Sequence, residues 1–188
     1  MDKAPNTGIA IQLAQSHVAA KDFDSALRVI EAWSRAHPQD RTALKALAEI
    51  QLGAGKGDAA RQTYALIVAA DPDDPQTLGG YAMLLQRLNH PAAIEVAEKA
   101  VKLAPADAEF VDKLGWILVR RGQLDNGIRH LRDARLRQPN SPEIRYHLAY
   151  ALNQSGRIGE ARDELTAALA GSARPGADMQ SLKAELGL

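Results

Sequence analysis

The segment Leu52–Arg61, LGAGKGDAAR, contains the residue types of a phosphate-binding loop, because three glycines and a lysine lie close together. A P-loop has the pattern G-x-x-x-x-G-K-[ST] between a strand and a helix: backbone N–H groups surround the phosphates and the hydroxyl holds Mg²⁺. Here Lys56 is followed by Gly57, which has no hydroxyl. The preceding residues place Leu44 and Leu47 at helical spacing, so no strand is predicted before the loop. The sequence does not favour a nucleotide site.

The other residues that could perform chemistry do not form a recognisable site. The five histidines are His17, His37, His90, His130 and His147. None belongs to an H-E-x-x-H motif or to a pair with metal-ligand spacing, and the serines lack a G-x-S-x-G context. The absence of cysteine excludes disulfides and thiolate chemistry. We therefore predict no enzyme activity, no cofactor and no metal, and we interpret His130 and His147 as solvated helix residues.

The composition is typical of a soluble domain with a packed core: of 188 residues, 46% are hydrophobic and 24% are charged. The 23 basic residues balance the 23 acidic ones, so no overall charge attracts nucleic acid or an anionic membrane. No apolar run approaches the ~20 residues that span a bilayer. The basic stretch at residues 120–138 is interrupted by Asp125 and Asp133, which favours a solvated helix face. We expect neither nucleic-acid binding nor membrane insertion.

An internal repeat explains the glycines. The stretches GAGKGDAARQTY, RRGQLDNGIRHL and QSGRIGEARDEL each follow one helical pattern and precede another, which divides the chain into units of about 34 residues. The units are 7–40, 41–74, 75–107, 108–141 and 142–175. A small residue recurs at the same position of each unit: Ala14, Ala48, Ala82, Gly115 and Ala149. Proline ends four units, where it stops a helix.

This pattern resembles the tetratricopeptide repeat, whose motif is W-x-x-L-G-x-x-Y, then A-x-x-x-F, then A, then P. The clearest unit is LGWILVRRGQLDNGIRHLRDARLRQP. The resemblance implies an all-α fold, a right-handed superhelix (α-solenoid) of five helix-turn-helix repeats within residues 1–175, followed by a C-terminal capping helix at 176–188. Gly55 then occupies a helix-to-helix turn, as Gly122 and Gly156 do, where glycine adopts a positive φ most easily.

The ends of the array are expected to differ. Residues 177–188 place Met179, Leu182 and Leu186 on one face, which is typical of a cap that covers the last repeat. No cap precedes residue 7, so we expect either a longer array or a contact with another chain. Trp33 and Ile67 stand where the motif has a small residue. The alternative function is therefore a self-associating structural module, for example a homodimer, in which Trp33 and Ile67 are buried against another copy of the chain.

The main hypothesis is a non-catalytic scaffold that binds a protein or peptide segment in its concave groove. The resemblance implies that the first helix of each unit lines this groove. The groove residues predicted to bind a partner are Met83, Arg87, Asp112, Trp116, Arg120, Tyr146, Tyr150 and Asn153. Aromatic rings beside guanidinium groups are typical of binding hot spots. The other interpretation is that Trp116 and Tyr150 only fill contacts between neighbouring helices.

A narrower resemblance concerns the last two units. The words LGW at Leu114–Trp116 and YHLAYAL at Tyr146–Leu152 are similar to the C-terminal repeats of lipoproteins that accompany exosortase and PEP-CTERM systems, and more loosely to scaffolds of bacterial exopolysaccharide secretion. This resemblance implies a periplasmic or outer-membrane-tethered protein whose anchor lies upstream of this chain. A cytoplasmic adaptor of the same repeat class is the alternative.

Overall fold

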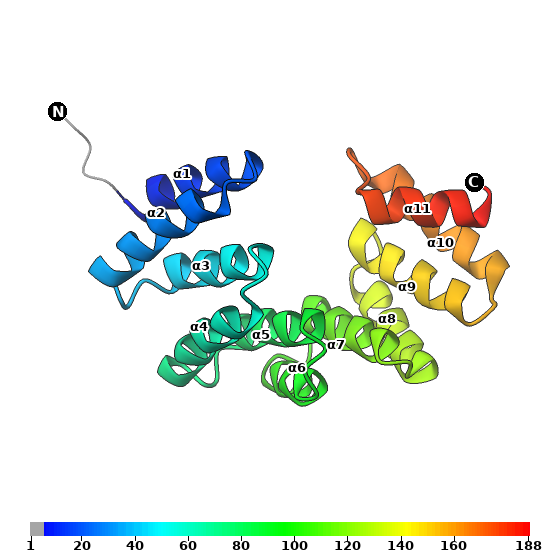
Figure 1. Cartoon of the computed structure of the whole chain (residues 1–188). Coiled ribbons are helices and arrows are strands. Elements are labelled where there is room, and N and C mark those ends of the chain that lie inside the picture. The colour runs from blue at the N-terminus through cyan, green and yellow to red at the C-terminus, as the bar shows by residue number, and fades with distance from the viewer. Residues whose placement is uncertain (1–5) are drawn as a thin grey trace. The chain divides into compact units, whose positions relative to one another are not determined.

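The computed structural model describes residues 6–188, which contain eleven α-helices and no β-strand (Figure 1). The helices are α1 (Thr7–Ala19), α2 (Phe23–Ala36), α3 (Arg41–Gly53), α4 (Gly57–Ala70), α5 (Pro75–Arg87), α6 (Ala93–Leu103), α7 (Ala108–Arg120), α8 (Leu124–Arg137), α9 (Pro142–Gln154), α10 (Ile158–Gly171) and α11 (Ala177–Leu186). The predicted all-α fold class is confirmed. The division into five repeats and a cap stays a prediction.

Polar side chains fix where several helices begin. The side chains of Asn6, Asp22, Asp40, Asp107 and Ser141 each accept a hydrogen bond from a backbone N–H in the first turn of the helix that follows. A helix leaves its first N–H groups without internal partners, and such a cap is worth about 1 kcal/mol. These caps set the register in which each helix presents its apolar face.

The turns within the helix pairs share one backbone conformation. Gly55, Gly122 and Gly156 have φ of 75°, 78° and 76°, which confirms their predicted role as turn residues. Lys21 and Asn89 occupy the same position of their units with φ of 60° and 54°. A side chain in this left-handed region costs about 1–2 kcal/mol, less for asparagine, so the fold imposes the conformation even where glycine is missing.

The helices form two compact units, residues 1–77 and 78–188, and the boundary falls within α5. In the first unit, α1 packs on α2, α2 on α3, and α3 on α4. Its core contains Ala14, Ala26, Ile30, Ala43 and Leu47. Three of these are fully buried alanines, and small side chains at a crossing let two helices approach closely.

Asp40 joins three parts of the first unit. Its carboxylate accepts hydrogen bonds from the Thr7 hydroxyl, from the Trp33 indole at 2.9 Å and from the Ala43 amide at 3.1 Å. Burial by itself would raise the pKa of Asp40, but these hydrogen bonds outweigh it and hold the pKa below its ordinary value. The ionised carboxylate therefore stabilises the contact of α1 and α2 with the start of α3.

In the second unit, the closest approach of two helices is between α7 and α8. A Cβ added at Gly127 would lie 2.5 Å from Val119 Cγ2 and 2.8 Å from the Gly115 carbonyl oxygen. At Gly115 it would lie 2.8 Å from Leu131 Cγ. Both positions therefore need glycine for space, and this contact fixes α7, which carries half of the residues of the site described below.

The last helix covers the end of the second unit. Met179, Leu182 and Leu186 of α11 are buried at 8%, 3% and 3% exposure in one hydrophobic cluster with Leu148 and Leu165. The helix contacts both α9 and α10. It therefore shields from solvent apolar side chains that α9 and α10 would otherwise expose.

Candidate functional site

Two helices of the second unit, α7 and α9, bring three aromatic rings and one guanidinium group together. The ring centroid of Trp116 lies 5.1 Å from that of Tyr150 in an edge-on arrangement and 6.2 Å from that of Tyr146. Arg120, one turn after Trp116, places its guanidinium carbon 5.5 Å from the Trp116 ring and 5.9 Å from the Tyr150 ring. We call these four residues the aromatic–arginine surface.

The aromatic–arginine surface is partly open to solvent. Its three rings are half-buried and Arg120 is exposed. An arginine over aromatic rings is held by cation–π attraction, which leaves its outer N–H groups able to bind an acceptor. Burial, assisted by the nearby Asp178, raises the pKa of Tyr146, so this phenol stays a hydrogen-bond donor over the physiological pH range.

A buried polar pair lies next to Trp116. The His147 ring stacks on the Trp116 ring with centroids 4.3 Å apart. His147 Nδ1 lies 2.9 Å and 3.0 Å from the two carboxylate oxygens of Asp112. The carboxylate can only accept, so Nδ1 carries the proton and donates. Because Asp112 belongs to α7 and His147 to α9, this hydrogen bond fixes the ring that supports Trp116.

The expectation that His147 is solvated is wrong. It is 7% exposed because its position on α9 faces α7 rather than solvent. Asp112, predicted among the groove residues, is 4% exposed and bonded to His147, so it does not reach the surface. His130 is half-buried, and burial lowers its pKa in spite of the nearby Asp133. No local sequence pattern indicates the burial of His147, because only the packing of α9 on α7 brings it to Asp112.

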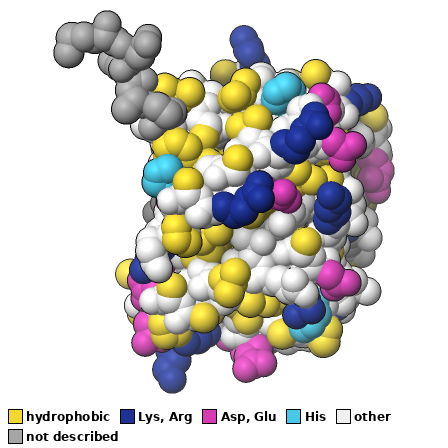
Figure 2. All heavy atoms as spheres, turned by 60° about the vertical axis from the view of Figure 1, so that its left-hand side comes forward, with side chains coloured by type: hydrophobic (Ala, Val, Ile, Leu, Met, Phe, Trp, Pro, Cys, Tyr) yellow, Lys and Arg dark blue, Asp and Glu magenta, His cyan; other side chains and the backbone are white. Residues whose placement is uncertain are grey.

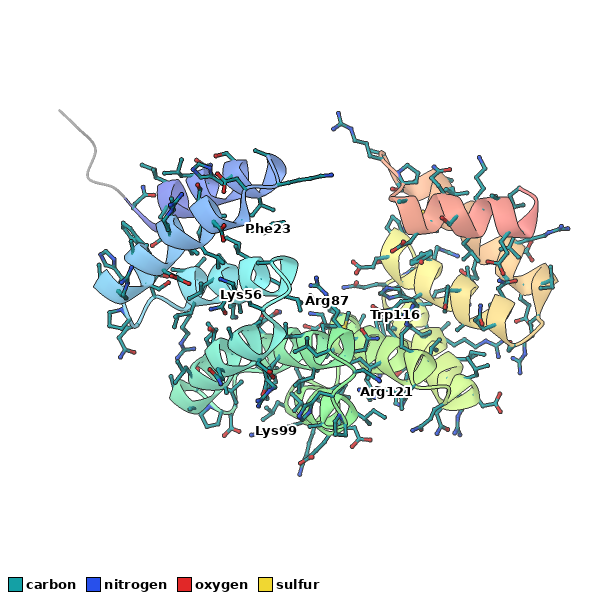
Figure 3. All side chains as sticks on the ribbon, in the orientation of Figure 1. Phe23, Lys56, Arg87, Lys99, Trp116 and Arg121 are labelled. Atoms are coloured by element: carbon teal, nitrogen blue, oxygen red, sulfur yellow. The ribbon has the colours of Figure 1, made fainter. Side chains whose placement is uncertain are left out.

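The remaining predicted groove residues differ in burial and in the residues that they contact. Met83 is half-buried and packs on the core that α5 shares with α7. Arg87, at the end of α5, is exposed, and Figure 3 shows it on the same side of the helices as Trp116. Asn153 Nδ2 donates to Glu185 Oε1 of α11 at 2.6 Å. Only Trp116, Arg120, Tyr146 and Tyr150 therefore form one contiguous group.

Comparison with known families identifies the fold. Models of the tetratricopeptide repeat match residues 11–75 and 118–186, which together make up most of the chain. The chain is a tetratricopeptide repeat protein. Members of this repeat class generally act as non-catalytic scaffolds for protein–protein interaction.

Relatives of this repeat protein include much longer chains. The TPR repeat-containing protein PA4667 of Pseudomonas aeruginosa is 30% identical over 158 residues. The cellulose synthase 1 operon protein C of Komagataeibacter xylinus is 28% identical over 158 residues. These alignments include 79% and 77% of this chain but only 26% and 11% of the two relatives. The chain therefore corresponds to a small part of each.

Solved structures support the same fold. The crystal structure of TTC0263, a tetratricopeptide repeat protein of Thermus thermophilus, superimposes with a TM-score of 0.76 at 23% identity and covers 97% of both chains. At this level of identity the similarity concerns the fold alone.

The residues predicted for self-association of this repeat protein are engaged inside its first unit. The Trp33 indole donates to Asp40, and its ring stacks on His37 with centroids 4.0 Å apart. Ile67 is 1% exposed. Neither side chain offers a free apolar face to another copy, so the structure does not favour the self-association hypothesis.

Two further observations concern metal ions and membranes. Within residues 6–188, no group of three or more histidine, aspartate or glutamate side chains is arranged to hold a metal ion. In the same range, no helix is both long and apolar enough to cross a membrane.

Proposed function

We propose that this repeat protein is a non-catalytic scaffold that binds a protein segment or helix on the aromatic–arginine surface of its second unit. The observation that supports the proposal is the contact of Arg120 with the rings of Trp116 and Tyr150. Tryptophan, tyrosine and arginine are the residues most enriched in binding hot spots. Met83, Arg87 and Asn153 extend the surface along the neighbouring helices.

The polar pair beneath the surface contributes preorganisation. Because Asp112 holds His147 and His147 stacks on Trp116, the indole is oriented before a partner arrives. A side chain that is already ordered loses less entropy on binding, which improves affinity. The exposed guanidinium of Arg120 favours a partner segment with an acidic side chain or a free backbone carbonyl beside an apolar anchor.

We further propose that the partner belongs to bacterial exopolysaccharide or exosortase-linked secretion, with the repeat protein in the periplasm or tethered to the outer membrane. The exosortase part of this proposal rests on the resemblance suggested by LGW and YHLAYAL in the sequence, and the exopolysaccharide part is supported by the relative named cellulose synthase 1 operon protein C. Deleting the gene in the source organism should reduce the secreted polysaccharide. Unchanged polysaccharide with intact growth would contradict this context but not the binding surface.

The binding surface itself is tested by site-specific photo-crosslinking in the source organism. A benzoylphenylalanine at Tyr150 keeps an aromatic ring on the surface, and the same residue at Leu136, which is 70% exposed on α8, is the matched control. We expect one protein to be crosslinked from position 150 and not from position 136. Equal crosslinking of that protein from both positions, or none from position 150, would contradict the proposal.

A further inference from the structure

A pocket of about 690 Å³ lies in the first unit. Its floor and one wall are apolar, formed by Leu44 and Leu47 of α3 and by Leu66, Ile67 and Ala70 of α4. The volume is within the range of small-molecule sites, about 300–1,000 Å³, and such sites have mainly apolar linings with few polar groups. The turn between α2 and α3 closes one end of the pocket.

Two residues that line the pocket, Ser34 and Leu44, are smaller or less polar than Arg135 and Arg145, the residues at the same positions of the later units. There, Arg135 and Arg145 both pair with Glu164 and fill the space between α8, α9 and α10. A cavity lined there by Arg132, Arg135 and Leu148, at the positions of Glu31, Ser34 and Leu47, measures about 130 Å³.

The charged side chains that line the pocket have a net positive charge, and one buried hydroxyl there is unpaired. Ser34 is 7% exposed, and its hydroxyl has no hydrogen-bond partner. A buried hydroxyl without a partner costs about 1–3 kcal/mol, so a ligand atom that satisfies it is favoured. Two guanidinium groups, of Arg35 and Arg41, stand against one carboxylate, of Glu31.

Of the two arginines, Arg35 is the one available to a ligand. Arg41 Nη1 already donates to Asp71 Oδ2 at 2.8 Å. Arg35 is exposed and donates only from Nε, to the Glu31 carbonyl oxygen at 3.3 Å. Its terminal N–H groups make no hydrogen bond or ion pair within the described range 6–188. Figure 2 shows hydrophobic side chains exposed beside basic ones on the face that comes forward from the left of Figure 1.

We propose that the pocket between α2, α3 and α4 binds a small amphipathic anion. Its apolar body lies on Leu44, Leu47 and Ile67, and its anionic group meets the guanidinium of Arg35. None of the residues that line the pocket belongs to the aromatic–arginine surface, so the pocket is a separate candidate site. A carboxylate bound by arginine is held by charge-assisted hydrogen bonds, which are stronger than neutral ones.

The test is a titration of the full ¹⁵N-labelled chain with sodium decanoate, followed by NMR. Decanol and decyltrimethylammonium have the same apolar body with a neutral or a positive end. We expect amide shifts confined to α2, α3, α4 and the turn at Pro38, with decanoate binding more tightly than either analogue. Shifts spread over the second unit, or equal binding of the cationic analogue, would overturn the proposal.

Substitutions distinguish the contribution of the arginine charge to ligand affinity from that of the apolar cavity. Arg35→Gln should weaken decanoate about tenfold, the effect of losing one hydrogen bond to a charged group, and leave decanol unchanged. Arg129→Gln, an exposed arginine on α8, is the matched control and should change nothing. Ser34→Leu should weaken binding, because it removes the unpaired hydroxyl and occupies part of the pocket. If that variant does not fold, Leu66→Glu, at a residue 66% exposed, should weaken decanoate by repulsion. Unchanged affinity in Arg35→Gln and Leu66→Glu would refute the site.

Discussion

The substitution His147→Phe removes the hydrogen-bond donor of Asp112 while keeping an aromatic ring against Trp116. Asp112 is 4% exposed, and both of its carboxylate oxygens lie within 3.0 Å of His147 Nδ1. In the variant this carboxylate is buried without its partner. Removing one member of a buried ionic or strongly polar pair costs about 3–5 kcal/mol. Because a phenylalanine ring can still stack at the 4.3 Å position, we expect about 3 kcal/mol, the lower end of that range.

The double variant Asp112→Ala/His147→Phe separates this penalty from lost packing. It removes the carboxylate as well, so only a small cavity beside α7 remains, and it should be more stable than His147→Phe alone by about 1–2 kcal/mol. The assay is urea unfolding followed by tryptophan fluorescence. The chain has two tryptophans, so a Trp33→Phe background leaves Trp116 as the reporter.

Two results would refute the reasoning on the buried pair. The first is a loss below about 1 kcal/mol in His147→Phe, which is the value of an exposed ion pair. The second is a double variant less stable than the single one, which would mean that Asp112 does not depend on His147.

Three further predictions concern the turn at Gly122, the turn at Lys21 and the carboxylate of Asp40 at the start of α3. Gly122→Ala should lower the free energy of unfolding by about 1–2 kcal/mol, because φ is 78° and a Cβ there meets nothing within 4 Å. Gly159 has equally open space for a Cβ but lies in helix α10, so Gly159→Ala should raise the free energy of unfolding by about 0.5 kcal/mol. Equal changes in the two variants, measured by urea unfolding, would contradict this prediction. Lys21→Gly should raise the melting temperature, since Lys21 has φ of 60°. Asp40→Asn should destabilise the protein near pH 7 and have a smaller effect as the pH falls through the lowered pKa of Asp40. Melting curves of Asp40→Asn and wild type that stay a constant distance apart down to pH 2 would contradict the assigned role of this carboxylate.

The fold could be predicted because its determinants are local and repeated. Glycines at Gly55, Gly122 and Gly156 mark turns with positive φ, and alanines such as Ala14 and Ala48 mark the helix crossings. Each of these residues can be recognised within a single predicted unit, and the same residue types recur at the same positions of the other predicted units. The same regularity shows that Lys21 departs from the pattern, although its strained φ follows only from the structure.

The site could be predicted only in part. The aromatic residues and Arg120 follow from the repeat register, which places Trp116 and Tyr150 on first helices. The Asp112–His147 pair does not, because it depends on how α9 packs on α7, and a histidine next to Tyr146 in sequence looks solvated. Burial of such a pair is decided by the angle between two helices, which no local pattern encodes.

The pocket of the first unit could not be predicted from the sequence, for a different reason. A cavity is defined by side-chain volume that is missing, and neither Ser34 nor Leu44 is unusual by itself. It becomes visible only when these residues are compared with Arg135 and Arg145, which fill the equivalent space in the second unit.

The most direct test of the proposed function is the affinity of the crosslinked partner segment for two single variants, measured by isothermal titration calorimetry. Trp116→Ala removes the centre of the aromatic–arginine surface, and a hot-spot residue of this kind is worth about 2 kcal/mol or more. We expect binding to weaken about 30-fold or more, while the exposed Arg129→Ala on α8 stays within about twofold of wild type. Equal affinities of Trp116→Ala and Arg129→Ala, with both proteins folded, would contradict the proposal that the partner binds here.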